Sequence, residues 1–290
     1  MSTSRHTVTA GLLRSWPLPA PSGTKNERGC VLVIGGSRET VGAVLLAGEA
    51  ALRVGAGKLQ VATVGSRAAE LGVALPEALV RPLPETPAGH IAATSSDLLV
   101  DLASGADSVV IGPGLAGVNC ARDLVAGVLP NVRGRVLLDA LALSFVTLDD
   151  ELRVASPPAV LTPNLSELAR LFGLLGSDDV DAMAGAVDAA RRTGAVVHGG
   201  GELSVTAAPN GQCWIDDHGA SGLGVSGSGD VLAGAVGGLL ARGTDPAQAA
   251  VWGARLHAEA GNRLAASVGS VGFLARQIAT ELAAALRQLD

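Results

Sequence analysis

The chain has 290 residues, 48% of them apolar and 17% charged, which is enough for one large domain with a sizeable core. Its net charge of −6 argues against a nucleic-acid or membrane-surface partner, because such surfaces attract basic proteins. Three scattered cysteines without a CxxC pair provide no metal or disulfide framework and suit a reducing compartment, so we expect a cytoplasmic protein. No signal-peptide core occurs near the start, and no apolar run is long enough to span a bilayer.

Strands and helices alternate along the chain. Residues 1–24 are expected to be an N-terminal connector with a short helix near 9–16. Strands are expected at 30–36 (with its closing Gly turn), 58–64, 77–82, 107–111, 135–139, 159–162, 195–198, 203–207 and 212–216. Helices are expected at 41–54, 95–104, 166–172, 178–193, 230–242, 246–266 and about 270–288. The turn sequence Ala-Pro-Asn-Gly between the last two strands indicates an antiparallel hairpin.

This alternation predicts a single α/β domain over 1–290, with a mostly parallel sheet covered on both faces and a small antiparallel part. In such sheets ligands bind at the carboxyl ends of the strands. Several Gly, Pro and Asp turns follow predicted strands and are expected to converge there: 35–36, 112–114, Asp139, 162–164 and 227–230. A binding site is therefore expected at that edge.

The most informative stretch is GSGD at 227–230, which opens a very apolar helix. Bare N–H groups at Gly227, Ser228 and Gly229, together with the helix dipole, would bind an anion such as phosphate. Asp230 lies in the first turn, where the dipole favours the ionised form, so it could deprotonate a hydroxyl that receives a phosphoryl group. The alternative is that Asp230 only caps the helix and the glycines only make a turn.

Four stretches together resemble one family. They are residues 25–63, VVIGPGL at 109–115, LTPNLSELARL at 161–171 and GSGDVLAGAVGGLLARG at 227–243. From about residue 20 onward the chain resembles the ADP- or ATP-dependent NAD(P)H-hydrate dehydratases of the ribokinase-like superfamily. The resemblance implies a three-layer α/β/α fold.

The resemblance also implies an activity. The S-epimer of hydrated NADH or NADPH would be phosphorylated on its ring hydroxyl by ADP or ATP, and loss of phosphate would restore the dihydropyridine. Asp230 would be the base, residues 227–229 the anion hole, and Mg²⁺ would bridge the phosphates. Glu167 would lie near the metal and phosphates, although it could instead only stabilise the start of its helix.

By the same resemblance, Ala43, Gly114, Asn164 and Asp230 would contact the hydrated cofactor. Gly42 with Ala43, and Gly114, could equally serve packing or turn geometry alone. Asp139 at a strand end could be a helix cap. Asn164 stands where relatives have a histidine, and it cannot carry a proton at neutral pH.

The adenine nucleotide would be held by Gly229 and by the segment His198, Gly199, Gly200, Gly201 and Ser204. Relatives have a lysine in this segment, whereas this chain has none and carries Glu202 instead. His198 could replace the lysine or be structural. Two other functions therefore stay open: a small-molecule kinase of the same fold, and a nucleotide-binding relative without turnover. Relatives tend to form homo-oligomers, so a homo-oligomer such as a tetramer is expected.

Overall fold

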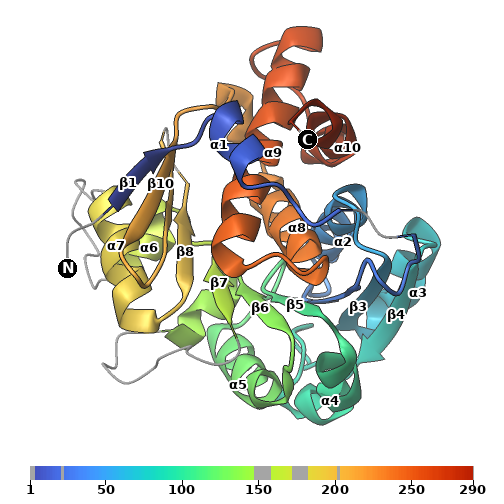
Figure 1. Ribbon diagram of the computed structural model, residues 1–290. Helices are drawn as coiled ribbons and strands as arrows, with labels where there is room; N and C mark the ends of the chain where they lie inside the picture. Colours follow the sequence, from blue (N-terminus) through green and yellow to red (C-terminus); the bar gives the residue numbers. More distant parts are fainter. Residues whose placement is uncertain (1–3, 21–22, 147–157, 172–181, 201–202, 290) are drawn as a thin grey trace.

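The computed structural model describes residues 4–20, 23–146, 158–171, 182–200 and 203–289, and one sheet runs through the middle of them (Figure 1). The strand order is β1-β10-β9-β8-β7-β6-β5-β2-β3-β4. The strands are β1 Ser4–Thr7, β2 Cys30–Ile34, β3 Lys58–Val64, β4 Ala78–Leu83, β5 Ser108–Ile111, β6 Arg135–Leu138, β7 Ala159–Leu161, β8 Val196–Gly199, β9 Ser204–Ala207 and β10 Gln212–Asp216.

Pairing is parallel from β8 through β7, β6, β5, β2 and β3 to β4. Strand β9 is antiparallel to both β8 and β10, which confirms the predicted hairpin and the small antiparallel part. The parallel strands are short, apolar runs that are buried on both faces, as a covered parallel sheet requires.

Helices cover both faces of the sheet. They are α1 Ala10–Ser15, α2 Gly42–Arg53, α3 Gly65–Ala74, α4 Ser96–Gly105, α5 Val118–Val128, α6 Leu165–Leu171, α7 Ala182–Thr193, α8 Ser228–Ala241, α9 Pro246–Ser267 and α10 Ala275–Leu289. Short 3₁₀ turns lie at Ala93–Ser95, Leu129–Asn131, Ala140–Val146 and Ser221–Leu223. Within the described ranges, none of these helices has the length and apolar content that crossing a membrane needs.

The core is split by the sheet into two halves. Alternate residues of one strand enter different halves: Val31 and Val33 pack with α2, α8, α9 and α10, whereas Leu32 and Ile34 pack with α4, α5 and α7. Figure 1 shows α8 and α9 on one side of the sheet and α4 and α5 on the other. This period of two is the expected result of burying both faces, and it confirms the three-layer architecture.

The N-terminal segment is more than a connector. Strand β1 extends the sheet by pairing in parallel with β10, and the expected helix near 9–16 is present as α1. The sequence analysis also missed α3 and α5, which follow β3 and β5 and complete two βαβ units. The described part of the predicted helix at 178–193 begins at Ala182, and 178–181 lie outside the described residues.

Candidate functional site

The GSGD stretch begins α8 as predicted. Gly227 is the N-cap in the left-handed conformation, with φ 87°, where a side chain would be strained. Gly229 and Asp230 are in the first turn, whose N–H groups have no partner inside the helix. The N–H of Ser228, however, donates to the carbonyl oxygen of Val225 at 3.1 Å, so the expectation of a bare N–H at this position is wrong. Ser228 can offer an anion only its hydroxyl.

Asp230 has a pKa raised to about 6 because burial penalises its charged form. The sequence argument from the helix dipole pointed the other way, and burial outweighs the dipole here. The carboxyl group is still about nine-tenths ionised at pH 7, so the expectation of a carboxylate at neutral pH holds. A base with its pKa this close to neutrality is well matched to taking a proton from a hydroxyl.

The start of α8 lies level with the start of α2. A Cβ on Gly234 would be 2.1 Å from the carbonyl oxygen of Ala47, and one on Gly238 would be 2.6 Å from that of Ala51. Both contacts advance by one turn in the same direction, so the two helices run in parallel and in register. One turn earlier on each helix, the same register sets Asp230 level with Ala43.

Ala43 and Gly114, both expected to contact the hydrated cofactor, lie next to each other. A Cβ on Gly114 would lie 2.8 Å from the Cβ of Ala43 and 2.4 Å from the carbonyl oxygen of Thr40. The Thr40 hydroxyl donates to the carbonyl oxygen of Gly114 at 2.7 Å, and Gly114 has φ 67°. Only a glycine fits between these groups, so the packing alternative is realised at Gly114.

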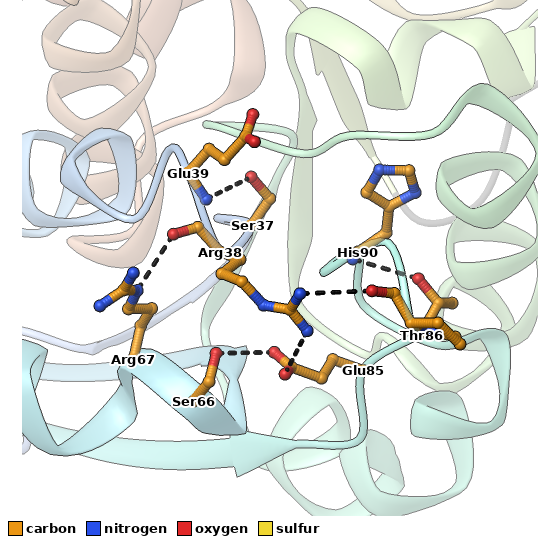
Figure 2. Close-up of polar contacts among 9 residues, drawn as sticks. Ser37, Arg38, Glu39, Ser66, Arg67, Glu85, Thr86 and His90 are labelled. Atoms are coloured by element: carbon orange, nitrogen blue, oxygen red, sulfur yellow. Dashed lines mark hydrogen bonds and ion pairs between the residues drawn. The ribbon is translucent and has the colours of Figure 1, made fainter.

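The turn before α2 is held from outside by Arg38 (Figure 2). The Arg38 guanidinium donates to Glu85 Oε1 at 2.9 Å and to the carbonyl oxygen of Pro87 at 3.2 Å. Its main-chain N–H donates to Gly89 O at 2.9 Å, and its carbonyl oxygen accepts from Arg67 Nε at 3.0 Å. These contacts fix the segment that carries Thr40 against the loop after β4.

A cavity of about 820 Å³ opens beside the start of α8. Its lining joins the ends of β6, β7 and β8 with the loop before α8 and one face of α9. The predicted site residues found in it are Asn164, His198, Gly200, Ser204, Ser228 and Gly229, together with Asp139. Ala43, Gly114, Gly227 and Asp230 are not part of the lining, Gly199 lies beside it in β8, and Gly201 is outside the described residues.

Three carboxyl groups interact beside the cavity: those of Asp139, Glu167 and Asp230. Asp139 is buried and accepts a 2.7 Å hydrogen bond from the Thr162 hydroxyl. Burial, with the negative charges of Asp230 and Glu167, raises the pKa of Asp139 to about 8. The Asp139 carboxyl group is therefore mostly neutral at pH 7. It bonds with Thr162 and also with the main chain of Ala140, the first residue of the 3₁₀ turn, so the capping alternative is realised there as well.

Asn164 and Glu167 form the start of α6. Asn164 Oδ1 accepts from the Glu167 N–H at 2.9 Å, and Glu167 Oε2 accepts from the Asn164 N–H at 2.9 Å. This reciprocal capping box realises the alternative that Glu167 stabilises its helix. It also occupies the Asn164 oxygen, so a ligand would meet the amide nitrogen.

Two imidazoles line the cavity, the buried one of His198 and the half-buried one of His257. His198 Nδ1 lies 2.9 Å from the Thr206 hydroxyl, and burial, with a smaller effect of His257, lowers the pKa of His198 to about 4. A neutral His198 cannot supply the positive charge of the lysine that relatives carry. His257 on α9 was missed by the sequence analysis, since a single histidine within an apolar helix gives no pattern; burial lowers its pKa to about 4 as well.

Comparison with known proteins identifies the family. Residues 31–284 match the NAD(P)H-hydrate dehydratase family. A Xanthomonas campestris protein named ADP-dependent (S)-NAD(P)H-hydrate dehydratase is 45% identical over 98% of this chain and 96% of its own length. The bifunctional NAD(P)H-hydrate repair enzyme Nnr of Moorella thermoacetica is 36% identical over 99% of this chain but only 55% of that enzyme, so the chain spans about half of such relatives.

Solved structures give the same result. The Bacillus subtilis ADP/ATP-dependent NAD(P)H-hydrate dehydratase, co-crystallised with ATP/Mg²⁺, superposes with a TM-score of 0.81 at 26% identity, covering 97% of this chain and 98% of that one. A ribokinase-like superfamily protein of Enterococcus faecalis shares the fold with a TM-score of 0.81 at 24% identity, over 98% of this chain and 96% of its own. The resemblance seen in the sequence is thereby confirmed, and the chain belongs to the NAD(P)H-hydrate dehydratase family.

Proposed function

We propose that this protein dehydrates the S-epimer of hydrated NADH or NADPH with ADP or ATP as phosphoryl donor. The observation that carries the proposal is the register of α2 and α8, which sets Asp230 level with Ala43 on one side while Ser228 and Gly229 line the cavity on the other. A hydroxyl held against Ala43 and Gly114 and a nucleotide in the cavity would then meet at Asp230.

The chemistry requires two steps. Asp230 accepts the proton of the ring hydroxyl while the hydroxyl oxygen attacks the terminal phosphorus of the nucleotide. The bond between that phosphorus and the rest of the nucleotide breaks at the same time. The phosphorylated ring then loses inorganic phosphate with its C–O bonding pair and a ring proton, which restores the double bond. Phosphate leaves more easily than hydroxide, and the N–H groups of Gly229 and Asp230 would stabilise the charge on the moving group.

The carboxylates near the cavity fit a magnesium ion. Burial and the negative charges of Asp230 and Glu167 keep Asp139 protonated, and a divalent cation among these groups would offset that repulsion and favour the ionised form of Asp139. We propose that these two residues hold Mg²⁺ together with the nucleotide phosphates. When bound, the ion would neutralise phosphate charge.

We propose ADP as the preferred donor. Among the described lining residues of the cavity there is no lysine or arginine, and the imidazoles of His198 and His257 are neutral. A cavity with so little positive charge favours the nucleotide with fewer phosphate charges. The relative from Xanthomonas is likewise named ADP-dependent. A homo-oligomer and a cytoplasmic location stay predictions.

The test is to incubate the protein with chemically hydrated NADH, Mg²⁺ and either ADP or ATP, and to follow the return of dihydronicotinamide absorbance. Return with ADP in the wild type and its loss in Asp230→Ala would support the reaction, the donor and the base together. A stable phosphorylated product without free phosphate would indicate a small-molecule kinase instead. ADP binding by calorimetry without turnover would indicate the non-enzymatic relative.

A further inference from the structure

His257 reaches across from α9 to the first residue of α8. Its Nε2 lies 2.9 Å from Oγ and 3.1 Å from the carbonyl oxygen of Ser228. Two positions before His257 on the same helix, Arg255 makes a buried ion pair with Asp216 at 3.1 Å. The helix that presents the imidazole is thus fixed to the sheet beside the loop that leads into α8.

The two contacts together define where the imidazole proton lies. A carbonyl oxygen can only accept a hydrogen bond, so the 3.1 Å contact requires a proton on Nε2. The same N–H is then shared with Oγ of Ser228 at 2.9 Å, where the oxygen accepts. Burial keeps the ring neutral, since it lowers the pKa of His257 to about 4, so Nδ1 carries the lone pair.

This arrangement fixes the direction of the hydrogen bonds that the Ser228 hydroxyl makes. With Oγ accepting from His257, the hydroxyl hydrogen is left to be donated elsewhere, and Ser228 faces the cavity. The Ser228 N–H cannot act in its place, because it already donates to Val225 O at 3.1 Å. The hydroxyl hydrogen is therefore what Ser228 can offer to an anion at the start of α8.

We propose that His257 is a positioning residue that holds the Ser228 hydroxyl as a hydrogen-bond donor to the phosphoryl group in transfer. Ser228 touches the reacting group and His257 acts through it. The expected effect on kcat rests on the proposed function. The imidazole tautomer and the binding of a nucleotide, however, can be measured without turnover.

The kinetic test compares His257→Leu, His257→Gln, Ser228→Ala and the double variant His257→Leu with Ser228→Ala. Loss of one transition-state donor costs about 10²-fold in kcat, so each apolar single variant should fall by about that factor with the KM for the hydrate unchanged. The double variant should be no slower than Ser228→Ala, because the two residues act as one unit. The glutamine amide can donate from the position of Nε2 and should restore part of the rate.

Gln248→Leu is the matched control on the same helix. Gln248 is buried and donates to the carbonyl oxygens of Trp16 and Pro17 at 3.1 and 2.8 Å, more than two turns before His257 on α9. Its loss should lower Tm while kcat stays at the wild-type value. A purely structural His257 would behave like this control, and multiplicative losses in the double variant would overturn the proposal.

The tautomer is tested by ¹⁵N NMR of the imidazole at pH 7, which should show His257 protonated at Nε2 only; protonation at Nδ1 would overturn the proposal. If the wild type does not convert the hydrate, the proposed function fails, and calorimetry with ADP and Mg²⁺ decides this inference. His257→Leu and Ser228→Ala should then weaken ADP binding equally, about tenfold, whereas unchanged affinity would overturn it.

Discussion

Gly234 on α8 lies so close to Ala47 on α2 that a Cβ at Gly234 would come within 2.1 Å of the Ala47 carbonyl oxygen. The absence of a side chain at Gly234 is therefore what lets two parallel helices bring their N-terminal ends to the same place. Both the stability of the helix pair and the geometry of the site should therefore respond to a side chain at Gly234.

Gly234→Ala should push the two helices apart. Overpacking of this kind costs about 1–3 kcal/mol of unfolding free energy, and the shift of Asp230 relative to Ala43 should also lower kcat. Chemical denaturation and steady-state kinetics check both effects. Gly105→Ala is the control, because a Cβ at Gly105 on α4 meets nothing within 4 Å, and its variant should keep both stability and kcat. Equal behaviour of the two variants would contradict the argument.

Asp230→Asn should lose activity and gain stability at once. Removal of a general base costs about 10²–10⁴-fold in rate, while replacing a partly buried carboxylate by a neutral amide relieves the burial that raises the pKa of Asp230 to about 6. Turnover and Tm at pH 7.5 are the measurements. A variant that keeps its rate would remove Asp230 from the reaction, and a fall in Tm would contradict the burial argument.

The pH profile of kcat should fall on the acid side. The carboxylate form of Asp230 is the active one, so kcat/KM, which reports the free enzyme, should halve near pH 6 and drop tenfold per pH unit below it. Bound nucleotide phosphates add negative charge, which moves this midpoint upward in kcat relative to kcat/KM. A rate that stays constant down to pH 4.5 would show that another group accepts the proton.

Asp139→Asn should gain stability relative to the wild type as the pH rises. Burial, with the charges of Asp230 and Glu167, raises the folded-state pKa of Asp139 from 3.8 to about 8. The native chain therefore keeps a proton that the unfolded chain has lost, and the unfolding free energy of the wild type falls with pH between about 4 and 8, by up to about 1.4 kcal/mol per unit. The asparagine variant lacks this slope. Denaturation at pH 5 and pH 8 measures the difference, which would be constant if Asp139 ionised normally.

Arg38→Ala should affect the hydrated cofactor more than the nucleotide. The Arg38–Glu85 pair is partly exposed, so its loss should cost little stability, but it loosens the turn that carries Thr40 toward Gly114. We expect KM for the hydrate to rise a few-fold while KM for ADP is unchanged. Arg53→Ala, which removes a similar ion pair with Glu49 at the other end of α2, should leave both constants unchanged.

Elements with a strong local pattern were predictable from the sequence. The apolar run of β2, the turn of the β9–β10 hairpin and the apolar helix α8 all lie where expected, within a few residues. Helix α3 was missed because it follows β3 directly, without a capping side chain at Val64 to mark its start. Strand β1 was missed because it is four residues long and largely exposed, and its partner lies near the other end of the chain.

The site was predictable in residue types but not in energetics. The glycines of the GSGD stretch indicated the start of α8, whereas Ala43 and Gly114 were named through the family resemblance alone. The state of Asp230 could not be read in this way, since its pKa depends on burial by segments far away in the chain. The same holds for His257, whose role depends on one contact between two helices.

The edge position of β1 has a consequence for handling the protein. Pairing in parallel with β10 covers main-chain groups along Gln212 to Ile215 that would otherwise face solvent. Proteolytic removal of the first eight residues would leave the edge of β10 unpaired and able to pair with another chain. Soluble aggregates should then be detected by size-exclusion chromatography before catalytic activity is lost. An affinity tag is therefore better fused after α10, away from the strand that shields the sheet.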